Sequence, residues 1–282
     1  MSYEKIELET LNYDPCRYPG AKLLFRGPRR KLISPYLAFL GGTDTYGKFI
    51  SQPFPSLIEQ KTGWLCVNFG WSNAGADVYL NEPSILQYAS NAQLTILQLP
   101  CAQNMSNRFY RVHPRRNDRF VRASKKLHKL YPEVDFTDFH FVRHMLRHLK
   151  SLSPERFEDV VDELTEAWLP RMRLLLSRIE SPVVLLWFSM RSPEEADDSL
   201  QITDEPGFVS REMIEGLRSE VKELVEFQPS VKAQESGQNG MVFSQIEAPA
   251  ASELMGPAAH VEVAQALETV ISGLISDPIN DS

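Results

Sequence analysis

The sequence predicts an α/β protein, a three-layer sandwich built around a mostly parallel five-stranded sheet. Apolar runs of strand length alternate along the chain with helix-length segments, an order typical of parallel strands joined by crossover helices. Two of the runs, the first and the fourth, are continuously apolar, as expected for strands that are covered on both faces. The five runs lie at 36–40, 64–69, 94–99, 183–188 and 224–227.

Helix-like segments separate these runs. In the longest segment, Glu155 and Glu158 occur in the first turns and Arg178 near the end, a polarity that suits the helix dipole. The last segment places its apolar residues at helical spacing, which predicts that one face packs inward. The expected helices cover 46–61, 75–91, 155–180, 210–222 and 260–275.

The predicted α/β domain spans residues 36–275. It follows a basic extension, 1–35, which either forms a hairpin at the sheet edge or adds to an anion site. Between the third and fourth strands, 105–154 forms an insertion, and its segment 108–150 carries twelve Lys or Arg against four Asp or Glu. We expect the insertion to form a basic helical cap, with helices at about 119–131 and 137–150. Residues 229–256, rich in Gln, Ser, Gly, Ala and Pro, indicate a mobile loop.

Composition excludes several classes of protein. The 282 residues carry a net charge of −7, which argues against a general nucleic-acid binder. Three widely spaced cysteines predict neither a disulfide framework nor a zinc site, and the apolar runs at Cys66 and Cys101 predict that these two are buried thiols. The N-terminus lacks the apolar region of a signal peptide, and the longest apolar run, 183–190, is too short to span a bilayer. We therefore expect a cytoplasmic protein without a nucleic-acid or membrane partner, whose oligomeric state stays open.

Polar and glycine residues follow the predicted strands, at the edge where parallel sheets bind ligands. Gly41-Gly42-Thr43 follows the first strand, and the glycines permit a tight turn that displays Thr43. Asn68-Phe69-Gly70 ends the second strand, and the amides of Gln103 and Asn104 follow the third. His260 opens the last helix.

The order of these blocks resembles that of the SGNH, or GDSL-like, hydrolases. The resemblance implies that Thr43 replaces the nucleophilic serine and that His260 is the general base. It also implies an oxyanion site made by Gly42, Gly70 and the amide of Gln103 or Asn104. Pro257 occupies the place of the acid that usually supports the histidine. Through its stretches Phe25-Arg-Gly-Pro-Arg-Arg30 and His113-Pro-Arg-Arg-Asn-Asp118, the whole chain also resembles an uncharacterised family of unknown function from Rhodobacter-like alphaproteobacteria.

A basic run beyond the third strand includes Arg115 and Arg116, whose guanidinium groups can bind sulfate, phosphate or carboxylate. We expect them to contact an anionic or glycan-like substrate, unless they form an ordinary solvated face. His140, His144 and His148 recur every four residues, but the glutamate of a metalloprotease helix is absent. We interpret them as a polar helical face and expect neither a metal nor a cofactor.

Three functions follow from these patterns. The first is a hydrolase or acyl-transfer enzyme that acts on an ester of a polar or anionic molecule. The second is a non-catalytic protein that binds an anion or a carbohydrate on the same fold. The third is a sulfo- or phosphoryl-transferase, although the turn after the first strand lacks the lysine of a phosphate-binding loop. In the simplest interpretation Thr43 merely caps a helix and His260 is an ordinary surface residue.

Overall fold

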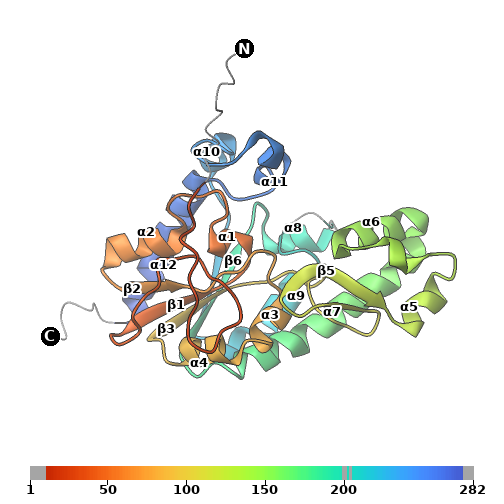
Figure 1. The fold of residues 1–282 in the computed structure, drawn as a ribbon, viewed down its shortest axis with the longest axis horizontal. Coiled ribbons are helices and arrows are strands. Elements are labelled where there is room, and N and C mark those ends of the chain that lie inside the picture. Colours follow the sequence, from red (N-terminus) through yellow and green to blue (C-terminus); the bar gives the residue numbers. More distant parts are fainter. Residues whose placement is uncertain (1–10, 199–201, 203–204, 276–282) are drawn as a thin grey trace, which may run out of the picture.

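The computed structural model describes residues 11–198, 202 and 205–275. Its centre is a parallel five-stranded sheet with the strand order β2-β1-β3-β6-β7 (Figure 1). This arrangement confirms the predicted fold class, and the five predicted strands agree with the observed ones to within one residue at either end. The strands are β1 (Tyr36–Leu40), β2 (Leu65–Asn68), β3 (Leu94–Gln98), β6 (Val183–Phe188) and β7 (Glu223–Phe227).

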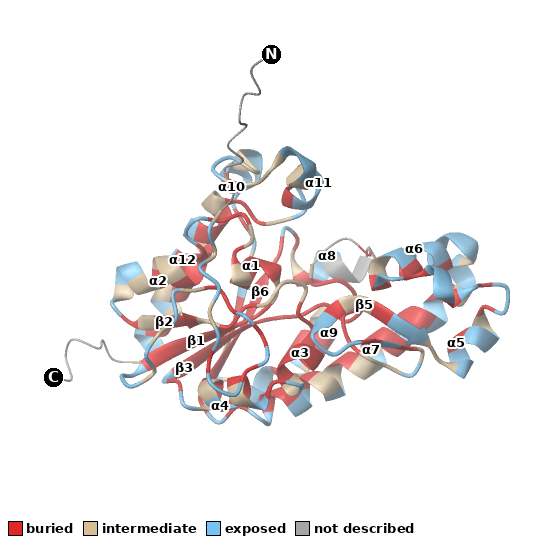
Figure 2. Cartoon of the chain, in the orientation of Figure 1, coloured by how far each residue is buried: buried red, intermediate tan, exposed pale blue. Residues whose placement is uncertain are grey.

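Helices cover both faces of the sheet, because the central strands carry apolar side chains on both sides. Leu37 and Phe39 of β1 point toward one face, and Ala38 and Leu40 point toward the other. The result is a buried sheet between two half-exposed helical layers (Figure 2). One layer consists of α2 (Phe54–Thr62) and α12 (Pro257–Leu274); the other includes α3 (Ala76–Leu80), α4 (Pro83–Ser90), α7 (Pro154–Leu176) and α9 (Arg211–Glu215).

Three of the expected helices are interrupted, and the interruptions have local causes. The segment 46–61 becomes a one-turn helix, α1 (Thr43–Tyr46), and α2, because Gly47 ends α1 with a φ of 76°. The segment 75–91 is divided at Pro83, whose ring and missing N–H start a new helix. Likewise 210–222 holds only α9 and a 3-10 turn, η2 (Arg218–Glu220).

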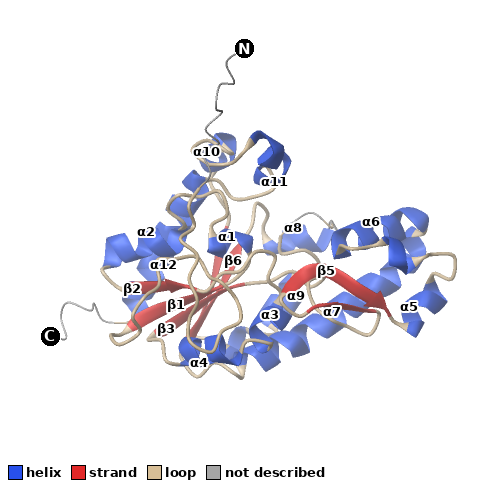
Figure 3. Ribbon diagram, viewed as in Figure 1, coloured by secondary structure: helices blue, strands red, loops and turns tan. Residues whose placement is uncertain are grey.

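The helix expected at 119–131 is only partly present. The first part of this segment belongs to the strand β5 (Arg116–Ala123), which pairs with β4 (Tyr110–His113) in an antiparallel hairpin apart from the central sheet (Figure 3), and the second part is helical. In β4 Tyr110 and Val112 are buried while Arg111 and His113 are exposed, an alternation that suits a strand covered on one face. The rest of the insertion is helical: α5 (Lys125–Leu130), η1 (Phe136–Asp138) and α6 (Val142–Leu152).

Two segments expected to lie outside the core contain ordered structure. Tyr18, Leu23 and Phe25 of the N-terminal segment are buried in the main core, where Phe25 packs against Phe69. Cys16 and Phe25 form an isolated antiparallel bridge, in place of a longer hairpin. The segment 229–256 contains α10 (Val231–Ser236), η3 (Gln245–Glu247) and α11 (Ala248–Ala251).

The three cysteines are free, and Cys66 and Cys101 are buried, as predicted. Burial raises the pKa of the Cys101 thiol to about 12 and also raises that of Cys66. These two thiols are therefore protonated packing groups. Within the described part of the chain, no helix has the length and apolar character needed to cross a bilayer.

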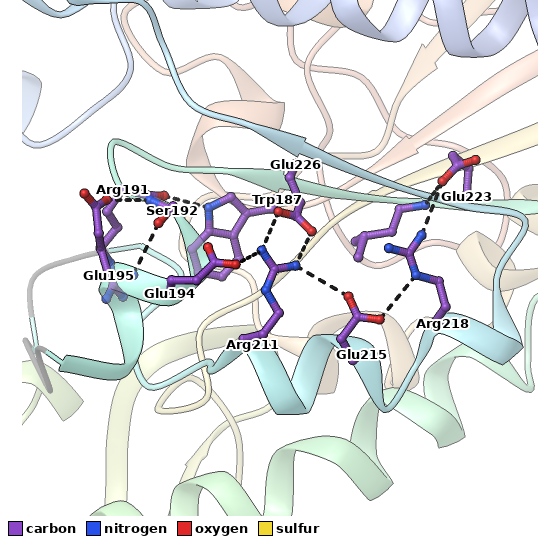
Figure 4. A network of polar contacts seen from close by, with 11 residues as sticks. Trp187, Arg191, Ser192, Glu194, Glu195, Arg211, Glu215, Arg218, Glu223 and Glu226 are labelled. Atoms are coloured by element: carbon purple, nitrogen blue, oxygen red, sulfur yellow. Dashed lines mark hydrogen bonds and ion pairs between the residues drawn. The ribbon is translucent and has the colours of Figure 1, made fainter.

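A network of ion pairs ties the edge strand β7 to the neighbouring α8 (Pro193–Asp198) and α9 (Figure 4). Arg211 is its centre and contacts the carboxylates of Glu194, Glu215 and Glu226. Arg218, which is more exposed, bridges Glu215 and Glu223. The network therefore holds the segment after β6 against the sheet.

Replacing Arg211 by alanine is expected to lower the free energy of unfolding by about 1 kcal/mol, at the upper end for exposed ion pairs because three carboxylates lose one shared partner. The matched change Arg218→Ala should cost less than about 0.5 kcal/mol. Urea unfolding at low and high salt tests this prediction. Because salt screens exposed ion pairs, high salt should reduce the difference in unfolding free energy between Arg211→Ala and Arg218→Ala. Equal losses for both variants would contradict a central role for Arg211.

Candidate functional site

A cleft lies over the carboxyl ends of the strands. The strand order reverses between β1 and β3, which is where doubly wound sheets bind their ligands. The cleft consists of two neighbouring cavities. The Thr43 cavity, about 270 Å³, and the Asp44 cavity, about 300 Å³, share the lining residues Glu205, Glu253 and Leu254. The 229–256 segment thus forms one wall of the cleft.

Thr43 lies at the start of α1, and its hydroxyl is held by Asn73. The Asn73 backbone N–H donates to Thr43 Oγ1 at 3.0 Å, and Thr43 Oγ1 is 3.3 Å from Asn73 Oδ1. Asn104 Nδ2 donates to the carbonyl of Asn73 at 3.4 Å. All three residues line the Thr43 cavity, so they offer a hydroxyl and two amides on one wall.

Asn73 is held in place by close backbone packing. Its φ of 56° lies in the left-handed region, which asparagine tolerates better than most residues. Two residues later, Gly75 lies directly against the Asn104 backbone. A Cβ added at Gly75 would be 1.7 Å from the Asn104 carbonyl oxygen, so a larger residue does not fit there. Asn117 Oδ1 accepts from the N–H of Gly75 at 3.0 Å. The packing of Gly75 on the Asn104 backbone therefore fixes the loop that carries Asn73 relative to the loop that carries Asn104.

Asp44 faces the second cavity. The residue is only 5% exposed, and its carboxylate accepts a hydrogen bond from the Met255 N–H at 3.2 Å. Burial, together with the negative charge of Glu205, raises the pKa of Asp44 to about 7, although hydrogen bonds from Met255 and Gln98 oppose the shift. Asp44 therefore changes its charge near neutral pH.

The charges of the cleft nearly cancel. Arg143 Nη2 donates to Glu205 at 2.7 Å, and Arg143 Nη1 donates to Glu253 at 3.1 Å. Lys48 and Asp118 also line the Thr43 cavity, and burial raises the pKa of Asp118. Two cations thus face three carboxylates there.

An aromatic ring completes the rim. Phe141 lines the Thr43 cavity and is 42% exposed. The guanidinium carbon of Arg119 lies 3.9 Å from the ring centroid, a cation–π contact. An apolar surface therefore borders the polar wall.

The side chain of Gln98 in β3 accepts hydrogen bonds from two backbone N–H groups of the turn after β1. Its Oε1 accepts from the N–H of Gly42 at 3.3 Å and from the N–H of Thr45 at 3.2 Å. The same oxygen accepts from Thr45 Oγ1 at 2.6 Å. The N–H groups of Gly42 and Thr45 are therefore already bonded, so Gly42 is not offered to an oxyanion.

Gly70 and Gln103 do not join the predicted oxyanion site. The Gly70 N–H donates to Asn68 Oδ1 at 2.8 Å, and a Cβ on Gly70 would lie 2.4 Å from the Tyr46 nitrogen, so the glycine serves the packing of α1. Gln103 is fully buried, and neither its amide oxygen nor its amide nitrogen contacts a partner among the described residues. Of the predicted amides, Asn104 alone reaches the cleft lining.

His260 is not brought to Thr43. Its ring is fully buried at the start of α12, stacked on Phe54 and edge-on to Phe188. Nδ1 accepts from the Phe54 N–H at 3.2 Å, and Nε2 has no hydrogen-bond partner within the described residues. Burial, together with the positive charge of Arg26, lowers the pKa of His260 to about 3, so the imidazole is neutral. His260 is therefore neither a surface residue nor hydrogen-bonded to the Thr43 hydroxyl.

Arg115 and Arg116 lie on the hairpin of the insertion, and neither is among the described residues that line the cleft. Arg115 Nε is 3.8 Å from Glu82, and its carbonyl accepts from the Trp71 indole. Arg116 is exposed on β5. The cations that do reach the cleft are Lys48, Arg143 and Arg191.

The predicted histidine face holds only in part. His144 and His148 are exposed on α6 beside Phe139, whereas His140 precedes the helix. Across the residues that the structure describes, no group of three His, Cys, Asp or Glu side chains is placed to hold a metal ion.

Sequence reasoning missed several cleft residues. Asp44 is adjacent to Thr43, but its position in the sequence does not reveal that its side chain faces the cleft. Asn73 lies in the turn after the second strand, and reading that turn in full would have found it. Arg143 and Glu205 carried no local signal, because they come from the insertion and from a distant loop.

The sheet order and the cleft at its reversal point define a doubly wound α/β protein with a polar strand-end cleft. The chain belongs to the family described as "Domain of unknown function (DUF6473)", whose model matches residues 1–275. Among solved structures it is similar to the lipase Lip_vut3 from a goat rumen metagenome, with 11% identity and a TM-score of 0.36. That match covers 82% of this chain and 97% of the lipase chain, and a likeness at this level carries no information on activity. No match was found among curated proteins.

Proposed function

We propose that the protein binds a small, uncharged, hydroxyl-rich molecule, such as a sugar ring, in the cleft. The wall of the Thr43 cavity carries this proposal. It combines a hydroxyl, two amides and three carboxylates, all groups that donate to or accept from ligand hydroxyls. Phe141 adds an exposed ring against which an apolar sugar face can pack.

The charges favour a neutral ligand over an anionic one. Arg143 already bonds to Glu205 and Glu253, so little of its charge is left for a ligand. The remaining cation of the Thr43 cavity, Lys48, lines it together with the carboxylate of Asp118. A sulfate or phosphate would have to displace the ion pairs of Arg143 and approach the carboxylates, which costs free energy.

Binding can be tested by calorimetry with D-glucose, D-glucuronate, glucose 6-sulfate and the linear polyol sorbitol. We expect the neutral ring to bind most tightly. Asn73→Ala and Asn104→Ala should each weaken it about tenfold, because a buried ligand hydroxyl would lose its partner. Asn91→Ala is the matched control: this residue is exposed after α4, at the opposite end of the strands. Tighter binding of the sulfated sugar would overturn the preference for neutral ligands.

Ester hydrolysis or acyl transfer is the second candidate. The observation that favours it is the position of the Thr43 hydroxyl, on the cleft wall at the start of α1 and near Asn104. This candidate requires labelling by a fluorophosphonate probe that is lost in Thr43→Ala. Because His260 is not hydrogen-bonded to Thr43, the general base would have to be another group. Labelling should therefore survive His260→Phe, which preserves the aromatic stack on Phe54.

A further inference from the structure

Building on the proposed ligand cleft, we propose that Asp44 and Glu205 form a proton-transfer pair within it. Asp44 accepts the proton of a bound ligand hydroxyl, and Glu205 stays a carboxylate beside Arg143. In this step the ligand O–H bond breaks and its electron pair stays on oxygen. The proton bonds to a carboxylate oxygen of Asp44, and the reverse transfer returns it to a ligand oxygen. The transfer needs no further reactant.

The two carboxylates reach one cavity from distant parts of the chain. Asp44 is the second residue of α1, directly after Thr43, whereas Glu205 belongs to the connection between α8 and α9. Both line the Asp44 cavity, and Glu205 also lines the Thr43 cavity. A ligand that extends from one cavity into the other therefore passes between Thr43, Asp44 and Glu205.

The pair is asymmetric, and this asymmetry assigns the roles. Glu205 has a cationic partner, Arg143, at 2.7 Å, and its side chain is 24% exposed. The contacts of Asp44 are neutral donors, the Met255 N–H and the Gln98 amide, and within the described residues it forms no ion pair. When two carboxyl groups face one enclosed space, the proton binds to the one without a counter-charge.

The surrounding charges support the same assignment. Glu253 and Arg191 line the Asp44 cavity, from the 229–256 segment and from the loop after β6. Burial raises the pKa of Glu205 and Arg143 opposes that shift, whereas the pKa of Asp44 is raised to about 7. A group that titrates near the working pH is suited to both accept and donate a proton.

The test follows the carboxyl carbons of the full chain, labelled with ¹³C at the aspartate side chains, by NMR from about pH 5 to pH 9. One aspartate is expected to titrate near pH 7, and its signal should be absent in Asp44→Asn. Asparagine is the matched replacement, because its Oδ1 can still accept from Met255 N–H while it cannot hold the proton. Glu205→Gln should lower the midpoint by about half a unit or more, since it removes the nearby negative charge.

Glu253→Gln is the control for a change at the same cavity, and we expect a smaller shift from it because the carboxylate that raises the pKa of Asp44 is that of Glu205. If no aspartate titrates near neutral pH, or if the titrating signal persists in Asp44→Asn, the proton-transfer pair is refuted. No ligand enters this experiment, so a missing titration would overturn the pair and leave sugar binding untouched. Absence of sugar binding with the titration intact would overturn the proposed function and, with it, the transfer from a ligand hydroxyl.

Discussion

Gly75→Ala is expected to destabilise the protein by about 3 kcal/mol or more, at the upper end for overpacking, because the new methyl meets backbone and not a flexible side chain. A Cβ at this position would lie 1.7 Å from the carbonyl oxygen of Asn104 and 2.7 Å from its carbonyl carbon. The two loops would have to separate, and Asn73 and Asn104 would move with them. Chemical unfolding measures the loss, and backbone NMR shifts of the two asparagines measure the displacement.

The same substitution elsewhere in the chain provides the control. Gly273 lies in α12, and a Cβ there meets nothing within 4 Å. Gly273→Ala should therefore stabilise the protein by about 0.5 kcal/mol, through the better helix propensity of alanine. If Gly75→Ala were as well tolerated as Gly273→Ala, the contact between the two loops would be looser than the structure indicates.

Asp44→Asn should make the protein more stable than the wild type above about pH 8, by at most about 4 kcal/mol if the carboxyl pKa rises from its ordinary value near 4 to about 7. The folded state holds this proton more tightly than the unfolded state does. The free energy of unfolding therefore falls as the pH rises from about 4 to about 7 and stays low above that range. Asparagine cannot ionise, so the variant escapes this loss.

Denaturant unfolding of both proteins at about pH 5 and pH 8.5 measures the difference. The advantage of the variant should be small at the lower pH and largest at the higher pH. Asp138→Asn, at an exposed position, should show no such change with pH. A constant difference across the range would show that Asp44 is ionised at both pH values in the folded protein.

The sheet could be predicted from the sequence because each strand is a short apolar run that depends little on distant residues. Helix boundaries depended on single residues such as Pro83 and Gly47, which a periodicity count overlooks. The hairpin was missed because its many basic residues suggested a helical cap, and because the alternation of buried and exposed residues in β4 spans only four positions. These errors concern single elements, so they do not change the order in which the five strands of the central sheet follow one another along the chain.

The cleft was harder to predict than the sheet. Thr43 and Asn104 were found because strand ends converge at one edge of a parallel sheet. His260 was misplaced because a position at a helix start does not reveal which layer the ring enters, and here it enters the aromatic layer of Phe54 and Phe188. Arg143 and Glu205 depend on tertiary contacts between distant segments, for which the sequence offers no rule of spacing.

The hydrogen bond between Met255 and Asp44 joins residues 211 positions apart. During synthesis on the ribosome, β1, β2, β3 and β6 emerge well before this C-terminal wall, whereas β7 directly precedes it. A nascent chain therefore exposes most of its strands before its binding space can close. Proteolytic trimming of the last fifty residues would remove α12 together with most of the wall, so it would uncover one face of the sheet and open the cavities to water.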